Sequence, residues 1–285
     1  MKSELGNDIP VPMNVEDRIY HQLYGPESAY QGRLVFIHGL MGAGQNWRKI
    51  VHYFEKTHQC LVYDQRGHGR SFKPEKGYSP DDYANDLFEL ASAKNWETFV
   101  VVGHSMGGRT AFQFASKYPK MVEKLVIEDI GPEQQDGAEK YYEKMLSVVP
   151  DRFISREDAK KFFNGEFQKK AQTRDKIDVI AQFLYTNIID FEDGSAAFRF
   201  RKQNIIDTVR LGRSASLWEE IKNLTMPVLW MRGENSQELS QENFERVLSL
   251  NPNITGTVIP RAGHWVHVEQ PAKFCEELKA FLERG

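Results

Sequence analysis

The sequence predicts an α/β protein in which a mostly parallel sheet is covered by helices on both faces. Strand-length apolar runs alternate with segments of helical spacing through the first 132 residues, and the alternation resumes near residue 216. One run, "TFVVVG" at residues 98–103, is almost entirely apolar and β-branched. Such a run is typical of a central parallel strand that is buried on both faces.

The predicted elements of the first part follow a regular order. The helix at 79–96 has a complete start, because Ser79 can cap it, Pro80 suits the first helical position and Asp82 completes a capping box. The predicted elements are a strand at 33–39, a helix at 47–56, a strand at 60–64, a helix at 79–96, a strand at 98–103, a helix at 107–119 and a strand at 124–129.

The alternation stops in residues 133–214. This segment holds 8 of the 18 Phe residues of the chain, so it is rich in aromatic side chains. It contains helix-like stretches at 137–149 and 155–163, and its short strand candidate is "AAFRFRK" at 196–202. A helical insertion into one α/β domain accounts for this break.

The first pattern returns after the insertion. We therefore expect residues 1–132 and 215–285 to form one α/β core, with residues 133–214 as a helical cap. The elements predicted for the last part are a helix at 216–224, a strand at 227–233, a helix at 240–250, a strand at 256–260 and a helix from about 271.

Composition narrows the class of protein. The 285 residues carry a net charge of −3, without the basic surplus that is typical of nucleic-acid binders. Cys60 and Cys275 lie far apart in apolar segments and are expected to be free thiols in a reducing compartment. No run of 18 apolar residues predicts a membrane span, and the polar start lacks an apolar signal core. We therefore expect a cytoplasmic protein.

The stretch "VVVGHSMGG" carries the strongest functional motif. Gly103, Ser105 and Gly107 fit the pattern G-x-S-x-G directly after an apolar strand and before a helix. This is the context of a nucleophile elbow, a turn so tight that small residues must flank the serine. We expect Ser105 to be the nucleophile and the Met106 N–H, at the start of the helix, to stabilise an oxyanion.

A second oxyanion donor is expected in the loop "HGLMGAGQ", which follows the strand at 33–39. The Leu40 N–H is the candidate donor. The glycines of this loop could also suggest a phosphate cradle, but neither a following Lys-Ser/Thr pair nor G-x-G-x-x-G is present.

Ser105 needs a general base, and His264 is the candidate. It lies in "PRAGHWVH", a loop between the last strand and the last helix, at the same edge of the sheet as the elbow. His267 is its competitor, but Gly263 gives His264 the freer backbone. His104 is expected to point away from the turn. His38 is expected to fix the conformation of the nearby backbone.

Four pieces together resemble the α/β-hydrolase superfamily. They are "HGLMG", "DQRGHGRS", "GHSMGG" and "AGHWVHVEQP", which occur in the order usual for that superfamily. The resemblance implies an α/β-hydrolase fold with a helical cap inserted after strand 6. Most members carry the catalytic Asp after the seventh strand, where this chain has Ser236 with Glu234 and Glu238 nearby.

A minority branch, which includes the YbfF-type esterases, places the acid at the end of the sixth strand instead. This chain resembles that branch in "DIGP" at 129–132, "NS" at 235–236 and "GHWVH" at 263–267. The corresponding strand ends in Glu128 and Asp129, and adjacent strand residues point to opposite faces, so both cannot reach His264. Asp129 comes last, where the chain leaves the sheet, and is the predicted acid.

The predicted activity is hydrolysis of a carboxylic ester or thioester through an acyl-enzyme. No H-E-x-x-H pattern or cysteine cluster indicates a metal, and no cofactor is expected. The aromatic cap favours a small-molecule substrate with an apolar acyl group, and the branch resemblance implies short to medium acyl chains. A C–C bond hydrolase or acyltransferase on the same fold remains an alternative, as does a non-catalytic ligand-binding protein.

Overall fold

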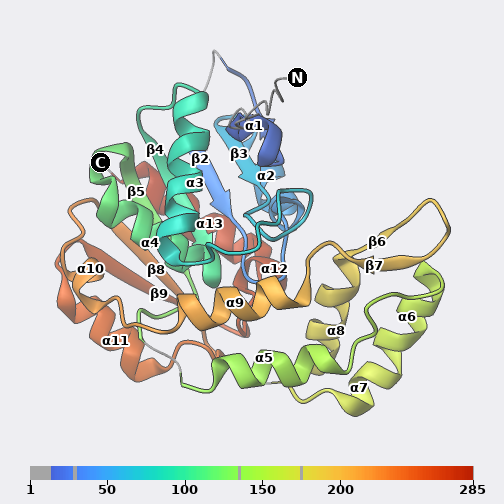
Figure 1. Cartoon of the computed structure of the whole chain (residues 1–285). Coiled ribbons are helices and arrows are strands. Elements are labelled where there is room, and N and C mark those ends of the chain that lie inside the picture. Colours follow the sequence, from blue (N-terminus) through green and yellow to red (C-terminus); the bar gives the residue numbers. More distant parts are fainter. Residues whose placement is uncertain (1–13, 28–30, 134–135, 174–175, 285) are drawn as a thin grey trace, which may run out of the picture.

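A seven-stranded sheet forms the centre of the protein (Figure 1). The computed structural model describes residues 14–27, 31–133, 136–173 and 176–284. In the strand order β1-β3-β2-β4-β5-β8-β9, all neighbours run parallel except β1 and β3, which pair antiparallel at one edge. The strands are β1 (His21–Tyr24), β2 (Arg33–Ile37), β3 (Gln59–Tyr63), β4 (Phe99–His104), β5 (Val122–Glu128), β8 (Val228–Gly233) and β9 (Ile254–Ile259).

Helices cover both faces of this sheet. Those on one face include α3, α4, α10 (Trp218–Lys222) and α11, and those on the other include α2 and α13. The helices outside the segment between β5 and β8 are α1 (Val15–Arg18), α2 (Arg48–Phe54), α3 (Pro80–Ala93), α4 (Met106–Lys117), α11 (Gln241–Leu250), α12 (Val266–Glu269) and α13 (Pro271–Glu283), with 3₁₀ turns η1 (Gly44–Trp47) and η2 (Pro119–Met121).

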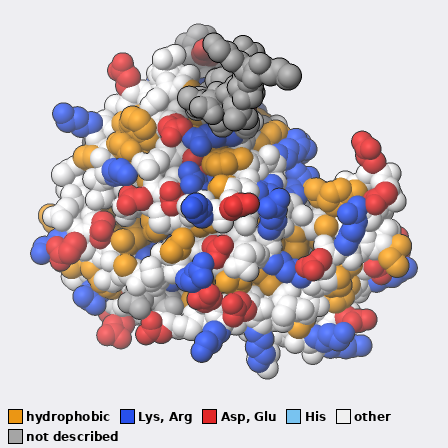
Figure 2. Space-filling view, viewed as in Figure 1, with side chains coloured by type: hydrophobic (Ala, Val, Ile, Leu, Met, Phe, Trp, Pro, Cys, Tyr) orange, Lys and Arg blue, Asp and Glu red, His pale blue; other side chains and the backbone are white. Residues whose placement is uncertain are grey.

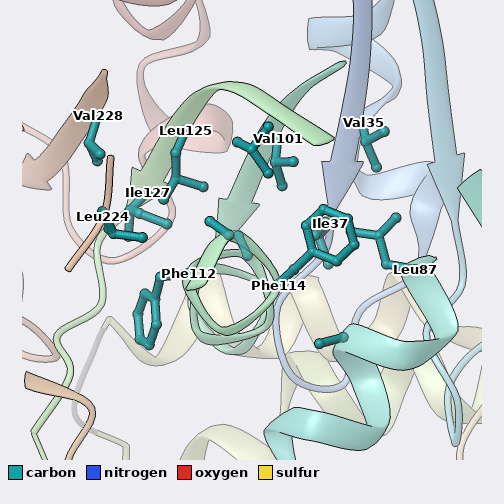
Figure 3. Close-up of a cluster of buried hydrophobic side chains, with 14 of the residues drawn as sticks. Val35, Ile37, Leu87, Val101, Phe112, Phe114, Leu125, Ile127, Leu224 and Val228 are labelled. Atoms are coloured by element: carbon teal, nitrogen blue, oxygen red, sulfur yellow. The ribbon is translucent and has the colours of Figure 1, made fainter. Parts of the chain in front are cut away.

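Alternating side chains of the strands build the two cores. On β4, Val101 packs toward α3 and α4, whereas Val100 and Val102 pack toward α2 and α13. Figure 3 shows the first of these cores, in which strand residues such as Val101 lie over Phe112 and Phe114 of α4. Truncation of one such fully buried side chain to alanine typically costs about 2–5 kcal/mol.

The predicted strands and helices of the α/β part are confirmed, with ends that differ by a few residues. The predicted start of α3 is confirmed in detail, since Ser79 Oγ accepts from Asp82 N and Asp82 Oδ2 accepts from Ser79 N. The antiparallel edge strand β1 was not predicted. Cys60 and Cys275 are both buried free thiols, as expected.

Residues 133–214, here called the inserted segment, lie between β5 and β8. Figure 1 shows helices α5 and α9 of this segment passing across the end of the core toward which the β2 arrow points. Its hydrophobic cluster includes Leu40, Met41 and Trp265 from the rest of the chain, which come from the loops after β2 and β9. Its elements are α5 (Ala138–Ser147), α6 (Arg156–Asn164), α7 (Glu166–Lys170), α8 (Ile177–Thr186), β6 (Ile188–Asp190), β7 (Ala196–Phe198) and α9 (Lys202–Gly212), and α10 (Trp218–Lys222) follows.

One detail of the prediction needs correction. The strand expected at 196–202 is limited to β7, and α9 already begins at Lys202; β7 pairs with β6, which was not predicted. The strand before the inserted segment, which the superfamily's numbering counts as strand 6, is β5 in chain order among the described residues.

The surface visible in Figure 2 mixes acidic and basic side chains, with small hydrophobic areas between them. Within the described part of the chain, no helix combines the length and the apolar character that crossing a membrane requires.

Candidate active site

Ser105 forms the tight turn between β4 and α4. β4 ends at His104 and α4 begins at Met106, and the residue between them has φ 54° and ψ −122°. A side chain in such a conformation costs roughly 1–3 kcal/mol, which the surroundings must offset. Ser105 is only 6% exposed and borders two cavities at this end of the sheet.

Glycines on both sides of Ser105 make this turn possible. A Cβ on Gly103 would lie 2.3 Å from the carbonyl oxygen of Gly107, and a Cβ on Gly107 would lie 2.4 Å from that of Ile37. Both neighbours are backbone atoms, so neither can move aside without displacing a strand or a helix. The G-x-S-x-G spacing therefore follows from the close approach of α4 to β2 and β4.

The two predicted oxyanion donors border the same cavity as Ser105. Leu40 belongs to the turn after β2, in which Gly42 N donates to Gly39 O at 3.1 Å. Met106 is the first residue of α4, so its N–H has no carbonyl partner within the helix. Both residues thus adjoin the space beside Ser105.

Asp129 and His264 are brought together by the ends of two strands. Asp129 directly follows β5, and His264 lies in the loop between β9 and α12. The distance between His264 Nδ1 and Asp129 Oδ2 is 2.9 Å. The imidazole of His264 borders the second cavity beside Ser105, so the three predicted catalytic residues converge at one edge of the sheet.

The environment of Asp129 is polar but closed to solvent. Its carboxylate accepts from Gly233 N at 2.9 Å and from Ser236 Oγ at 2.5 Å, in addition to His264. Burial raises the pKa of Asp129, while the hydrogen bonds from His264, Ser236 and Gly233 act in the opposite direction. Its backbone φ of 51° is a second strained position at this site.

Ser236 is the site residue that the sequence analysis did not identify as functional. It occupies the position where most members of the superfamily carry the acid, and here it donates a hydrogen bond to Asp129, directly after β5. The "NS" pair at 235–236 was the available signal, but its resemblance gave no role for the hydroxyl. The nearby carboxylates face other partners, because Glu234 accepts from Arg261 N and Glu238 lies 3.5 Å from Arg213.

Glu128 makes a second, parallel contact with the same loop. It accepts from His267 Nδ1 at 2.8 Å and from His267 N at 2.9 Å, and both side chains are buried. The ring of His267 also stacks on Trp47, with centroids 4.2 Å apart. His267 therefore faces a different carboxylate and borders neither of the two cavities beside Ser105.

His104 and His38 each form a hydrogen bond with a main-chain atom, in different ways. His104 Nε2 donates to the carbonyl oxygen of His264 at 2.9 Å, so its ring supports the loop of the candidate base. Burial and the neighbouring His264 and His267 lower the pKa of His104 far below its ordinary value, which keeps this ring neutral. His38 Nε2 accepts from Gln65 N, in agreement with the predicted backbone-locking role.

One group of side chains among the described residues has the composition of a metal site. The donor atoms of His104, Glu128 and His267 all lie within 4.8 Å of one another. Glu128 and His267 are hydrogen-bonded to each other, and His104 is bonded to His264 O. These hydrogen bonds explain why the three side chains lie close together, and they support the loop that carries His264.

The chain belongs to the α/β-hydrolase fold family, whose model matches residues 32–271. A putative esterase/lipase of Haemophilus influenzae is 32% identical over 88% of this chain and 83% of its own length. An sn-1-specific diacylglycerol lipase of Danio rerio is 29% identical over 88% of this chain and 78% of its own length. Among solved structures, a marine microorganism esterase is 27% identical with a TM-score of 0.78, covering 93% of this chain and 99% of that one.

Proposed function

We propose that this protein is a serine hydrolase that cleaves carboxylic esters or thioesters through an acyl-enzyme. The observation that carries the proposal is the 2.9 Å contact between Asp129 and His264 at the cavity that Ser105 borders. An elbow serine, an imidazole and a buried carboxylate at one edge of the sheet are the parts that acyl transfer requires.

In the proposed reaction, Ser105 Oγ attacks the acyl carbon while His264 Nε2 accepts the serine proton. The bond to the leaving group then breaks, and His264 delivers this proton to the leaving oxygen or sulfur. Water attacks the acyl-enzyme in the same manner, with His264 again as the base, and releases the acid and free Ser105. Asp129 holds the imidazole through Nδ1 and stabilises its positive form.

The backbone N–H groups of Leu40 and Met106 are the proposed oxyanion donors. Removal of one such donor typically lowers turnover by about 10²- to 10³-fold. The proposed steps use only side chains and backbone of this chain, so no metal or organic cofactor takes part in them.

The proposed substrate is a small ester or thioester with a largely apolar acyl group. Tyr142, Met145, Phe183 and Trp265 line the second cavity beside Ser105 and supply apolar contact area. The names of the relatives from H. influenzae and D. rerio favour carboxylic esters over other bonds.

Labelling with a fluorophosphonate probe tests the proposal, because the probe reacts with an activated serine. We expect the wild type to be labelled and Ser105→Ala to be unlabelled. Ser147→Ala is the matched control, since Ser147 is exposed on α5 and its hydroxyl donates to Lys144 O. Labelling that persists in Ser105→Ala would refute the assignment.

A substrate panel separates esters from thioesters. Nitrophenyl esters and CoA thioesters from acetyl to palmitoyl would be compared by kcat/KM in the wild type and in Ser105→Ala. We expect Ser105-dependent turnover in at least one series. If neither series is turned over, the protein is not the proposed hydrolase.

A further inference from the structure

Neither cavity beside Ser105 has room for a substrate. Each holds about 30 Å³ of free space, which is enough for a few water molecules at most, and Ser105 itself is 6% exposed. A substrate therefore reaches Ser105 only if side chains that line these cavities move. They can move only toward free space, so the larger spaces nearby indicate the direction.

A groove with about 1040 Å³ of free space lies next to the second cavity. Its lining comes from η1 and α2 of the core and from α8 of the inserted segment. The side chains of Gln45, His52 and Gln182 belong to this lining and are exposed, so the groove is open to solvent. It has room both for a side chain that moves and for part of a substrate.

Phe183 and Trp265 separate the groove from the second cavity. They are the two described residues that line both spaces, and their ring centroids lie 5.5 Å apart. Trp265 is 7% exposed and lies between His264 and His267, which are both held by buried carboxylates. Phe183 is only partly buried on α8. The ring of Phe183 is therefore the one that can move into the groove.

Apolar side chains form part of the lining of the groove. Val179 lies one turn before Phe183 on α8, at the spacing that places both on one face of the helix. Val268 of α12 also lines the groove and is 47% exposed. The charged side chains of the lining, which include Arg48 and Glu55, have both signs. A neutral, largely apolar group suits such a groove better than an ion does.

The position of His264 identifies the part of the substrate that meets the groove. His264 borders the second cavity and not the first, and its ring centroid lies 5.1 Å from that of Trp265. Because His264 delivers a proton to the leaving group in the proposed reaction, the leaving group lies beside His264 and Trp265. From that position, Phe183 is the barrier between the leaving group and the groove.

We propose that the leaving group of the substrate is a bulky, apolar alcohol or thiol that lies in the groove between α2 and α8. Phe183 is then a specificity-determining residue, because its ring must rotate into the groove before such a group can pass from the solvent to His264. A small leaving group makes little contact with the groove. This inference rests on the proposed function and names the substrate class of the same site.

Methyl acetate and benzyl acetate test the proposal, because they share an acyl group and their alcohols differ in size rather than in acidity. We expect the wild type to prefer benzyl acetate in kcat/KM by about tenfold or more, the effect of burying an aromatic ring. Phe183→Ala removes the contact with Trp265 that must be broken, so this preference should rise by about two- to tenfold. Phe191→Ala, an exposed aromatic residue of the same inserted segment, should leave it unchanged.

A label that fills the groove tests its role without a substitution in the core. Val268→Cys can be labelled with a pyrene maleimide after folding, because Cys60 and Cys275 are buried free thiols. We expect the label to remove most of the preference for benzyl acetate that the unlabelled variant shows. Val258→Cys is the matched control, since Val258 is 41% exposed on β9 and is not among the described residues that line the groove.

A preference that changes neither in Phe183→Ala nor on labelling of Val268→Cys would overturn the inference. If both esters are nevertheless cleaved in a Ser105-dependent manner, the proposed hydrolase stands and only the role of the groove is wrong. Absence of Ser105-dependent cleavage of these two esters and of the nitrophenyl and CoA series would refute the proposed function, and this inference with it.

Discussion

At the scale of single residues, Glu128 and Asp129 differ in the histidine that each one meets. Asp129 contacts His264 beside Ser105, whereas Glu128 contacts His267. The alternation of side chains along a strand separates two chemically similar neighbours in this way. Their replacement by the corresponding amides therefore distinguishes a catalytic carboxylate from a structural one.

We expect Asp129→Asn to lower kcat by about 10⁴, because the amide no longer fixes the imidazole tautomer or stabilises its positive form. Hydrolysis of a nitrophenyl ester under saturating conditions measures the effect. The side chain keeps its size, so the loss would report on charge rather than on packing.

Glu128→Gln is the matched control for this experiment. The glutamine oxygen can still accept from His267 N and Nδ1, so we expect a loss of roughly tenfold at most. If Glu128→Gln were the inactive variant and Asp129→Asn the active one, the acid would have to be reassigned to Glu128.

Some of these residue roles could be predicted from the sequence and others could not. Ser105, His264 and Asp129 have local patterns, namely a tight turn, a Gly-His loop and a strand end. Partners such as Ser236 for Asp129 and His267 for Glu128 depend on how loops meet in space, which spacing along the chain does not encode.

At the scale of elements, the turn between β4 and α4 determines where the nucleophile lies. The turn is held in place because α4 packs directly on the backbone of β2 and β4 at Gly103 and Gly107. An added methyl group at either glycine must separate the helix from the sheet.

We expect Gly103→Ala to lower the free energy of unfolding by about 3 kcal/mol or more, since overpacking against backbone is among the costly mechanisms. Gly32→Ala serves as the comparison, because its Cβ would make an ordinary 3.7 Å contact with His58 and should change the free energy by about 1 kcal/mol or less. Urea unfolding measures both. Equal effects would show that the turn tolerates the methyl group.

The elements that the sequence predicted are those with strong periodicity or complete caps. β4 is buried along its whole length, and α3 has both halves of its capping box. β1 is only half-buried at the edge of the sheet, and β6 and β7 have three residues each. Such short or half-exposed segments are stabilised by their neighbours rather than by their own composition, so local patterns do not reveal them.

At the scale of the whole molecule, the site is placed where the core and the inserted segment share one hydrophobic cluster. Leu40 and Trp265, on loops beside Ser105 and His264, belong to the cluster of the inserted segment. The position of that segment and the shape of the site are therefore coupled. The site also affects the stability of the whole protein, because the Asp129 side chain is buried and its own backbone is strained.

We expect the stability of the protein to depend on pH through Asp129. Burial raises its pKa in the folded state, so its contribution is present below the ordinary aspartate pKa and is lost as pH rises through the raised value. Asp129→Asn does not ionise and avoids this loss, which amounts to about 1.4 kcal/mol for each pH unit by which the pKa is raised.

Urea unfolding of both proteins between about pH 4 and about pH 7 measures this difference, because groups that do not interact with Asp129 contribute equally to both proteins and cancel in the comparison. We expect Asp129→Asn to gain stability relative to the wild type as pH rises. A gap that is constant across this range would mean that Asp129 titrates alike in the folded and unfolded protein.

The paired contacts of Glu128 with His267 and of Asp129 with His264 have a mechanical consequence. A loop attached at one point can swivel about it, whereas a loop attached at two points three residues apart can neither swivel nor slide. Inserting or deleting one residue between His264 and His267 would leave at most one attachment intact. The loop therefore tolerates changes of side chain at its other positions far better than any change of length.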